Sequence, residues 1–583
     1  ETGPTPGGDP GGAGGAGGRG AQAKLDGWIL WQWWWEHNKD RFLASATESG
    51  RINMGSAYYW FDGGAKYPPR DITLVSMTQR HTPAYTTLKD VLATDKAAEV
   101  RAEAAIAMGR LGLVPAQGDD KGKEGQSDNL VVRELIHAVE KDPNAEVRHS
   151  AILGLGISGD PDGCEYLMRN YARLAVEDKA YANIALGLAR HMEAIGHFLD
   201  HLPKSGNDRS ATDEHIAAIH GIGLLANDGN RAAIVAELNK DGRNGIERLE
   251  KLLDRRGIDA IVAQTIQTLS RLQASRREVE KVAGARTSED IKWAAILGLS
   301  NYYGDEKEAK DAADALEGKA GFKSGAGQDK VFATIALGEL ARRLDANSKV
   351  RADITKFLKK EALESRRNKY TRSASCIALG VAGDRTAIPE MAALFSDSTA
   401  DHYELAAASV GLGLLRATEH TDTIKTEVML KSRWDPDARG YAALGVALMG
   451  DTTRVDDLRD FMKNETQVRI RRQCTLALGV LGDSKHIKEM IRFFAKDWKK
   501  QQNYEVSNAA YGLAWIRDQS AVEDLAKMAK TNNDPLVRGM ACIALGYSAA
   551  RDRVNPLTRC YENQSFRNRF GNWEILYAIS RIL

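Results

Sequence analysis

The chain has 583 residues, and its 80 lysines and arginines balance its 79 aspartates and glutamates to a formal net charge of +1. This balance gives no long-range attraction to nucleic acid, so we expect no nucleic-acid partner. The longest apolar run, residues 28–35, is far shorter than the about 20 residues of a membrane-spanning helix. We therefore expect no transmembrane segment, which leaves peripheral contact with a cell envelope open.

Residues 1–24 are dominated by glycine and proline, a composition that buries too little apolar surface to order itself. We expect a flexible arm there. The first residue is Glu1 rather than a methionine, which indicates a processed or engineered start and favours an exported protein: periplasmic, envelope-associated or extracellular. The five cysteines are an odd number without CxxC spacing, so no disulfide framework is expected.

Residues 25–85 are rich in aromatic side chains and do not repeat. Helical spacing would place Trp28, Trp31 and Trp35 on one side, and each buried indole contributes at most about 4 to 6 kcal/mol. We expect this segment to cap the first stacked unit, with a carbohydrate-stacking or membrane-surface role as the alternative. The candidate interaction residues are Trp28, Trp31, Trp33, Trp34, Trp35, Tyr58, Tyr59 and Trp60.

From residue 86 onward the chain repeats a short phrase of small and aliphatic residues that ends in glycine. In the C-terminal half the phrase ends at Gly411, Gly445, Gly479, Gly512, Gly546 and Ser580, at intervals of 34, 34, 33, 34 and 34 residues. Upstream copies with looser spacing end at Gly109, Gly156, Gly187, Gly221, Ser270, Gly298, Gly338 and Gly380. Roughly fourteen units exceed the three or so that a stable stack needs.

Each unit contains two segments with apolar residues at helical spacing, which predicts a pair of helices. Glycine inside a helix costs about 0.5 to 1 kcal/mol relative to alanine, so its recurrence indicates close approach of neighbouring helices. Many second helices open with a Val-Arg pair, which predicts a buried valine and an arginine paired with an aspartate of an adjacent turn. The pairs are Val100-Arg101, Val147-Arg148, Val468-Arg469 and Val537-Arg538.

These features resemble HEAT repeats, in particular the short bacterial HEAT-like type also found in bilin lyases, over about residues 86–583. The segment WWWEHNKDRFL, which begins at Trp33, resembles the start of exported bacterial HEAT-repeat proteins. The resemblance implies a solenoid that holds other molecules rather than one particular activity.

Several motifs suggest chemistry but have simpler interpretations. GLGISG at residues 154–159 closes a helix instead of following a strand, so packing explains it better than nucleotide binding. Cys376, Cys474 and Cys542 occupy one register of the repeat, which favours a buried apolar role. The basic stretch of residues 356–372 suits phosphate or an acidic partner, but is more often a solvated face. Two glycine-rich insertions, residues 112–130 and 315–331, are expected to be surface loops.

Histidines are concentrated at His191, His197, His201, His215 and His220. His197 and His201 are four residues apart and share a helix face with acidic residues nearby, a ligand supply that suits a divalent metal. The sequence has no HExxH and lacks the repeated His-Glu pairs of iron-binding HEAT-type hydroxylases. We therefore expect no metal or other cofactor and no catalytic residue, and keep a metal-dependent or lyase-type enzyme as the alternative.

The sequence predicts an all-α fold, a right-handed α-α superhelix of about 13–14 helix pairs with an aromatic N-terminal cap. Its expected domains are the arm at 1–24, the cap at 25–85 and the solenoid at 86–583. We expect an elongated, non-enzymatic scaffold that binds protein partners or copies of itself, with a self-assembling subunit of an envelope or extracellular filament or sheath as its most specific form.

Overall fold

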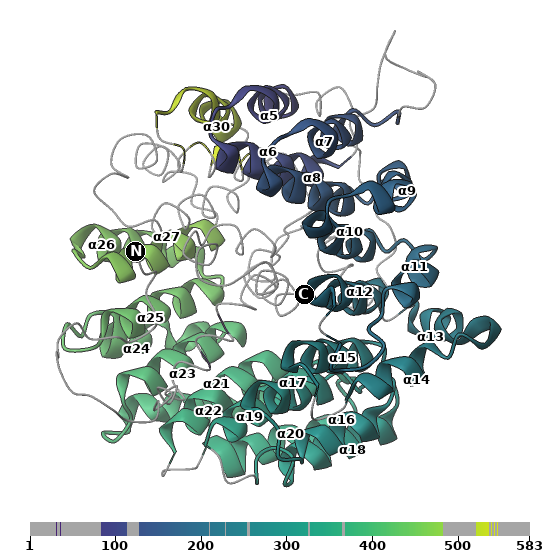
Figure 1. Ribbon diagram of the computed structural model, residues 1–583. Helices are drawn as coiled ribbons and strands as arrows, with labels where there is room; N and C mark the ends of the chain where they lie inside the picture. Colours follow the sequence, from purple (N-terminus) through teal and green to yellow (C-terminus); the bar gives the residue numbers. More distant parts are fainter. Residues whose placement is uncertain are drawn as a thin grey trace, which may run out of the picture.

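The computed structural model describes residues 31, 35, 83–112, 127–208, 210–227, 229–253, 257–323, 327–363, 368–481, 520–533, 535, 538, 541, 542 and 545. All its elements in these ranges are helices, which confirms the predicted all-α class. They alternate between an outer and an inner layer of one curved stack (Figure 1). The expected arm at residues 1–24 lies outside the described residues.

The first helix of each pair belongs to the outer layer. The outer helices are α5 (Pro83–Thr94), α7 (Leu130–Lys141), α9 (Pro161–Asn170), α11 (Ala194–Asp200), α13 (Arg231–Asn239), α14 (Gly245–Glu250), α16 (Arg276–Ala283), α18 (Glu306–Glu317), α20 (Lys349–Phe357), α22 (Ile388–Ala393), α24 (Thr421–Ile424), α26 (Val455–Asn464) and α30 (Ser520–Thr531). Short 3-10 segments flank them at Tyr171–Arg173, Lys240–Gly242, Lys251–Leu253, Arg385–Ala387, Leu394–Ser396, Thr418–His420 and Thr452–Arg454, and π segments at Leu358–Leu363 and Lys425–Met429.

The second helix of each pair belongs to the inner layer, and each packs most extensively on the inner helix of a neighbouring pair. The inner helices are α6 (Ala98–Leu111), α8 (Ala145–Ser158), α10 (Val176–Leu188), α12 (Thr212–Leu225), α15 (Asp259–Arg271), α17 (Glu289–Leu299), α19 (Gly327–Arg343), α21 (Lys369–Ala382), α23 (His402–Leu414), α25 (Pro436–Leu448) and α27 (Val468–Val480). The hydrophobic core is therefore continuous along the stack.

The repeated glycines bring neighbouring inner helices into backbone contact. A Cβ atom built on Gly187 would lie 2.7 Å from the Cα atom of Gly221 in the next inner helix. A Cβ atom on Gly338 would meet the Cα atom of Ala378 at 2.6 Å. Real Cβ atoms essentially never approach so closely, which confirms the prediction that glycine recurs for close helix packing.

Arginines of the Val-Arg pairs join consecutive repeats, as predicted. Arg101 of α6 donates two hydrogen bonds to the carboxylate of Asp142, at 2.7 and 2.9 Å, immediately before α8 begins. Arg148 of α8 donates to Asp178 of α10 at 3.0 Å. The valines beside both arginines are fully buried. Each pair thus anchors one side chain in the core and extends the next across the repeat boundary.

The turns contain the expected helix-start chemistry. Asp160 and Asp435 accept hydrogen bonds from the backbone amides two residues ahead, and proline occupies the first turn of both α9 and α25. At the end of α8, Gly159 adopts φ +66°, a left-handed conformation that glycine tolerates. These acidic and glycine-containing turns therefore need no bound ion or nucleotide to explain them.

The second insertion, expected as a surface loop over residues 315–331, is helical at both of its ends. Residues 315–317 end α18 and residues 327–331 form the first turn of α19. Asp329 is buried there because it accepts hydrogen bonds from Lys292 and from the Trp293 indole. The turn between the two helices is held by a bond from the Phe322 amide to the Leu316 carbonyl, at 2.6 Å. Most of the first insertion, residues 113–126, lies outside the described residues.

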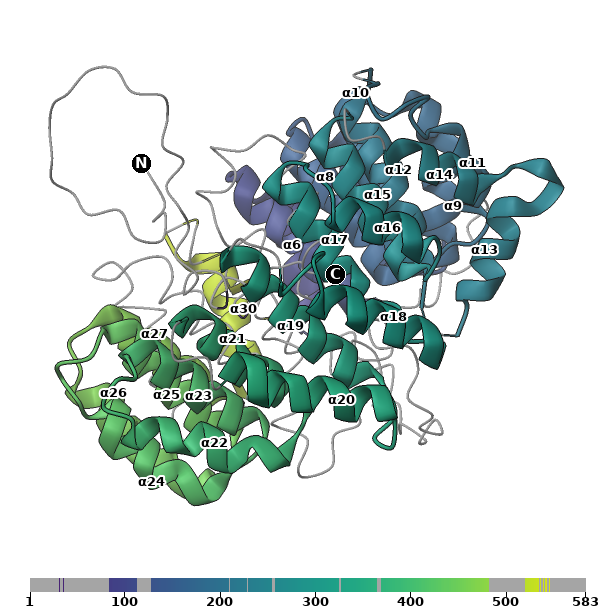
Figure 2. The ribbon, with the colours of Figure 1, turned by 90° about the horizontal axis from the view of Figure 1, so that it is seen from below.

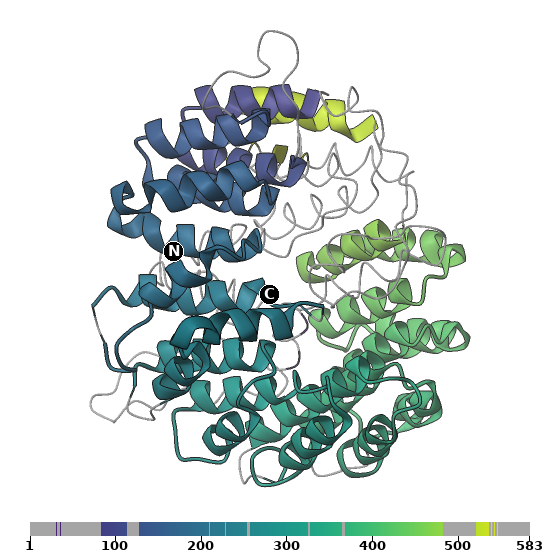
Figure 3. The same cartoon turned by 90° about the vertical axis from the view of Figure 1, so that its right-hand side faces the viewer.

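The stack curves until its two described ends meet. Figures 1 and 3 show α30 beside α5, and an ion pair between Lys530 and Asp90 joins the two helices. Seen from below, α19, α20 and α21 connect the part of the stack that contains α6–α18 to the part that contains α22–α27 (Figure 2). The elongated body predicted from the repeat is therefore wrong in one respect, because the curvature brings the last described unit back to the first. Among the described helices, none has the length and apolar character needed to cross a bilayer.

Candidate functional site

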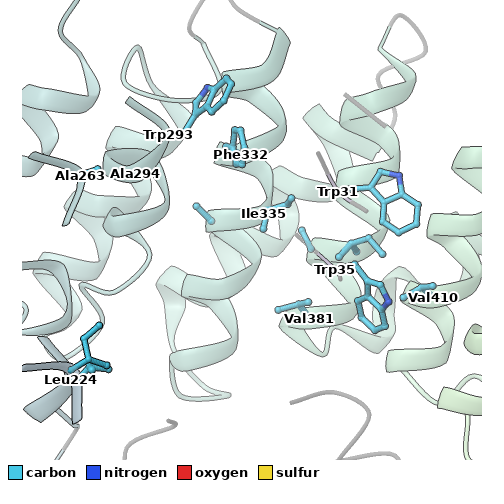
Figure 4. Close-up of a cluster of buried hydrophobic side chains, with 14 of the residues drawn as sticks. Trp31, Trp35, Leu224, Ala263, Trp293, Ala294, Phe332, Ile335, Val381 and Val410 are labelled. Carbon is cyan, nitrogen blue, oxygen red and sulfur yellow. The ribbon is translucent and has the colours of Figure 1, made fainter. Parts of the chain in front are cut away.

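An aromatic contact joins the N-terminal segment to the inner layer, and we define it by Trp31, Trp35, Val381, Val410 and Tyr441. The Trp31 and Tyr441 rings lie 5.4 Å apart between centroids, tilted by 60°. In Figure 4 the Trp35 indole lies between Val381 of α21 and Val410 of α23. Both indoles are fully buried. Trp31 therefore lies against α25, a helix about 400 residues away in sequence.

The aromatic cap over the first repeat is not found at the two tryptophans that the structure describes. Trp31 contacts Tyr441 of α25, whereas the first repeat consists of α5 and α6. The open side of α5 is instead covered by α30. This arrangement is favourable because the face of a similar unit matches the exposed face of a repeat.

The other candidate interaction residues lie outside the described part of the chain: Trp28, Trp33, Trp34, Tyr58, Tyr59 and Trp60. Their contribution to binding stays a prediction.

Two of the five clustered histidines form a hydrogen-bonded network with residues of three elements. The Tyr171 hydroxyl donates to the Glu214 carboxylate at 2.9 Å, and the Asn183 amide donates to Tyr171 at 3.1 Å. His197 Nε2 lies 2.9 Å from the Asn183 side-chain oxygen, so this nitrogen is the donor. His201 Nδ1 donates to the His197 carbonyl at 2.7 Å, and its Nε2 lies 3.4 Å from Glu214.

Burial and the neighbouring His201 ring lower the pKa of His197 to about 4, so the ring is neutral at physiological pH. The same burial, reinforced by Glu214, raises the pKa of Tyr171. Tyr171 packs edge-on against both imidazoles, with ring centroids 4.3 Å from His197 and 4.8 Å from His201. These polar atoms are engaged with one another, and their bonds hold α10, α11 and α12 together.

Of the remaining clustered histidines, His191 and His220 make their contacts with residues outside this network. His220 is buried in α12, where its Nδ1 atom lies 2.9 Å from the amide nitrogen of Gln264 in α15. His191 contacts Glu193 at 3.7 Å. In the ranges that the structure covers, no group of three or more histidine, cysteine, aspartate or glutamate side chains has an arrangement that could hold a metal ion.

Acidic residues of following turns pair with described members of the basic segment 356–372. Lys369 contacts Asp401 at 3.0 Å. Arg372 contacts Asp397 at 3.0 Å and Glu404 at 3.2 Å. Burial raises the pKa of Glu404, and hydrogen bonds from Thr399 with that from Arg372 lower the pKa of Asp397 to about 2. These side chains thus connect repeats in the same way as the Val-Arg arginines.

The described cysteines have the apolar role that the repeat predicted. Cys164, Cys376, Cys474 and Cys542 are all free thiols and all buried. Burial raises the pKa of the Cys164 and Cys376 thiols to about 12, which disfavours the reactive thiolate.

Sequence reasoning missed two relationships that matter for function. Tyr441 was not recognised as a partner of the N-terminal tryptophans, because it occupies an ordinary position in the repeat phrase YAALG. The pairing of Arg538 with Asp95 was also missed. The aspartate that lies six residues before Arg101 and Arg148 was a usable signal for the second relationship.

The repeat architecture is matched by known proteins. A family model for HEAT repeats matches residues 86–187. The chain is similar to the karyopherin Kap121p bound to the extreme C-terminus of the protein phosphatase Cdc14p: 12% identity and a TM-score of 0.34, over 80% of this chain and 54% of that one. Importin beta in an ammonium sulfate condition is similar at 13% identity and a TM-score of 0.35, over 80% of this chain and 69% of that one.

Human deoxyhypusine hydroxylase in complex with glycerol is similar at 13% identity and a TM-score of 0.20, over 49% of this chain and 96% of that one. The chain thus spans about half of the length of the karyopherin, 54%. Comparison with the curated proteins gives no match. With TM-scores of this size, the fold assignment rests on the repeats themselves. The described part of the chain is an α-solenoid, and its residues 86–187 match HEAT repeats.

Proposed function

We propose that this solenoid is a non-enzymatic scaffold for protein-protein interaction, whose inner layer binds segments with closely spaced aromatic side chains. The observation that carries the proposal is the aromatic contact, in which Trp31 and Trp35 are completely buried and Trp31 packs against Tyr441 of the inner layer. Neither tryptophan belongs to a repeat, so the layer accepts side chains from a separate segment. Buried tryptophan and tyrosine side chains are the usual energetic centres of protein interfaces.

The test uses the full chain with its own tryptophans removed from the contact. A labelled peptide of residues 26–43 is titrated into the Trp31→Ala/Trp35→Ala variant and into the parent chain, and binding is followed by fluorescence anisotropy. We expect tighter binding to the variant, because the parent already fills the contact. Adding Tyr441→Ala should weaken peptide binding about 3- to 10-fold, the equivalent of one aromatic pair.

The matched control adds Tyr166→Ala, which removes a tyrosine from outer helix α9, bonded there to Glu140. Peptide affinity should not change. Equal binding to parent and Trp31→Ala/Trp35→Ala chains, or equal weakening by the two tyrosine substitutions, would contradict the proposal.

Self-assembly into an envelope or extracellular filament is the more specific form of this proposal. It requires a free end on each copy, and in the closed arrangement α5 and α30 are engaged with each other. Measurement of mass across a concentration series tests it, with growth of head-to-tail oligomers as the supporting result. The exported location also stays a prediction, and fractionation of the native cells tests it.

A further inference from the structure

The last described unit and the first repeat meet through complementary charges and buried apolar side chains. Lys530 of α30 contacts Asp90 of α5 at 2.7 Å. Arg538 donates two hydrogen bonds to the carboxylate of Asp95, at 2.8 and 3.0 Å. Beside these pairs, Ala529, Ala541, Cys542 and Leu545 are fully buried.

The Arg538–Asp95 ion pair has the same sequence spacing and the same kinds of partner as an ion pair between consecutive repeats. Arg101 donates to the carbonyl of Asp95, six residues before it, and to the carboxylate of Asp142 in the next turn. Arg538 donates to the carbonyl of Asn532, also six residues before it, and to the carboxylate of Asp95. Asp95 precedes Arg101 by six residues, just as Asp142 precedes Arg148.

The last described unit therefore docks on the first repeat as though the first repeat were the next one in the stack. We infer that the α30 unit and the α5-α6 repeat form a specific head-to-tail interface, in which the α30 unit of the same chain docks on the first repeat, and that this interface closes the described solenoid into a ring. The side chains of Arg538 and Asp95 are only 13% and 12% exposed, so their pair is shielded far more than an ordinary surface ion pair.

Two ends that complement one another either close on themselves or join successive copies. Connection through one chain gives the ends an effective concentration on the order of millimolar, provided that the connecting body bends without strain. The arc of inner helices already has the curvature that closure needs (Figure 1). At micromolar protein concentration, closure within one chain is therefore favoured over association of two chains.

The first experiment uses the unmodified chain at micromolar concentration. A carbodiimide couples the Lys530 amine to the Asp90 carboxylate only where the two are in contact, and mass spectrometry of gel-separated bands identifies the linked peptides. Lys425 and Asp457, 2.7 Å apart within the stack, provide the internal control. We expect both links in the monomer band. A Lys530–Asp90 link confined to dimer or larger bands, or absent while the control link forms, would overturn the inference.

The second experiment reverses the charges of the partly buried Arg538–Asp95 pair. Asp95→Arg and Arg538→Asp should each abolish the Lys530–Asp90 link and increase the radius of gyration measured by X-ray scattering. The double variant should recover both. The control is Arg469→Asp, which breaks a 3.0 Å pair with Asp437 inside the stack and should leave the link in place. Single variants that keep both the link and the parental radius, or a folded double variant that recovers neither, would refute ring closure. If a single variant loses its helical circular dichroism signal, it has unfolded, and the Lys530–Asp90 cross-link in the parent chain then serves as the test of ring closure.

Discussion

Gly380 and Gly411 lie so close that a Cβ atom on Gly380 would be 2.8 Å from the Cα atom of Gly411 and 2.9 Å from its carbonyl oxygen. Both neighbours are backbone atoms, which cannot move aside by changing a rotamer. The contact between α21 and α23 therefore depends on the absence of a side chain at position 380. The same relationship recurs between other inner helices, so it sets the spacing of the whole stack.

Gly380→Ala should lower stability by about 1–3 kcal/mol, because the methyl group forces α21 and α23 apart. Thermal unfolding followed by circular dichroism provides the measurement. The matched control is Gly196→Ala in α11, where an added Cβ would meet no atom within 4 Å. That substitution should leave the melting temperature unchanged or raise it, because alanine favours a helix over glycine. Similar losses of stability in both variants would show that Gly380 is not needed for the close spacing of α21 and α23.

Arg372→Ala should destabilise the protein by about 3–5 kcal/mol, since it leaves the buried carboxylate of Glu404 without its cation. Arg372 and Glu404 are almost fully buried, at 6% and 2% exposure of their side chains. Chemical denaturation of the variant and the parent measures the loss. Lys310→Ala removes an exposed pair with Asp314 and should cause no measurable change. An Arg372→Ala chain as stable as the parent would show that its ion pairs add nothing to the joint between repeats.

The local parts of this architecture were predictable from sequence because each rests on a short-range pattern. Gly187 and Gly221 mark the same register of successive units, and the structure places them in contact. Arg101 was expected to reach an aspartate of an adjacent turn, and it reaches Asp142. In both cases the signal and the contact lie within one or two repeats, where helix periodicity determines which side chains can meet.

The long-range parts were not predictable from the same patterns. Curvature of a solenoid accumulates from a small rotation at every repeat, so no single unit encodes the meeting of Asp95 with Arg538. The burial of Trp31 against Tyr441 joins a non-repeating segment to one of many similar inner helices. Hydrophobicity predicted that the tryptophans would be covered, but it gave no means of choosing α25 over the first repeat.

The buried cysteines should resist thiol reagents in the folded protein. In a Cys560→Ser chain, the remaining thiols are Cys164, Cys376, Cys474 and Cys542, all of them buried. Burial raises the pKa of Cys376 to about 12, so both access and ionisation disfavour reaction near neutral pH. Titration with a chromogenic disulfide should detect the thiols only after denaturant is added. Rapid reaction of a stoichiometric thiol in the native chain would contradict the burial of this helix register.

The network around His197 should make stability fall with decreasing pH. The ordinary pKa of this histidine is 6.5, and burial with the adjacent His201 lowers it to about 4 in the folded protein. Between these values the unfolded chain binds a proton at His197 that the folded protein excludes, so stability present above pH 6.5 is lost as the pH falls to 4. His197→Gln keeps a donor toward Asn183 and removes this titration. Melting temperatures measured from pH 7 to pH 4 should therefore decline more steeply in the parent than in the variant. Parallel curves would show that the imidazole takes up its proton as readily in the fold as in the unfolded chain.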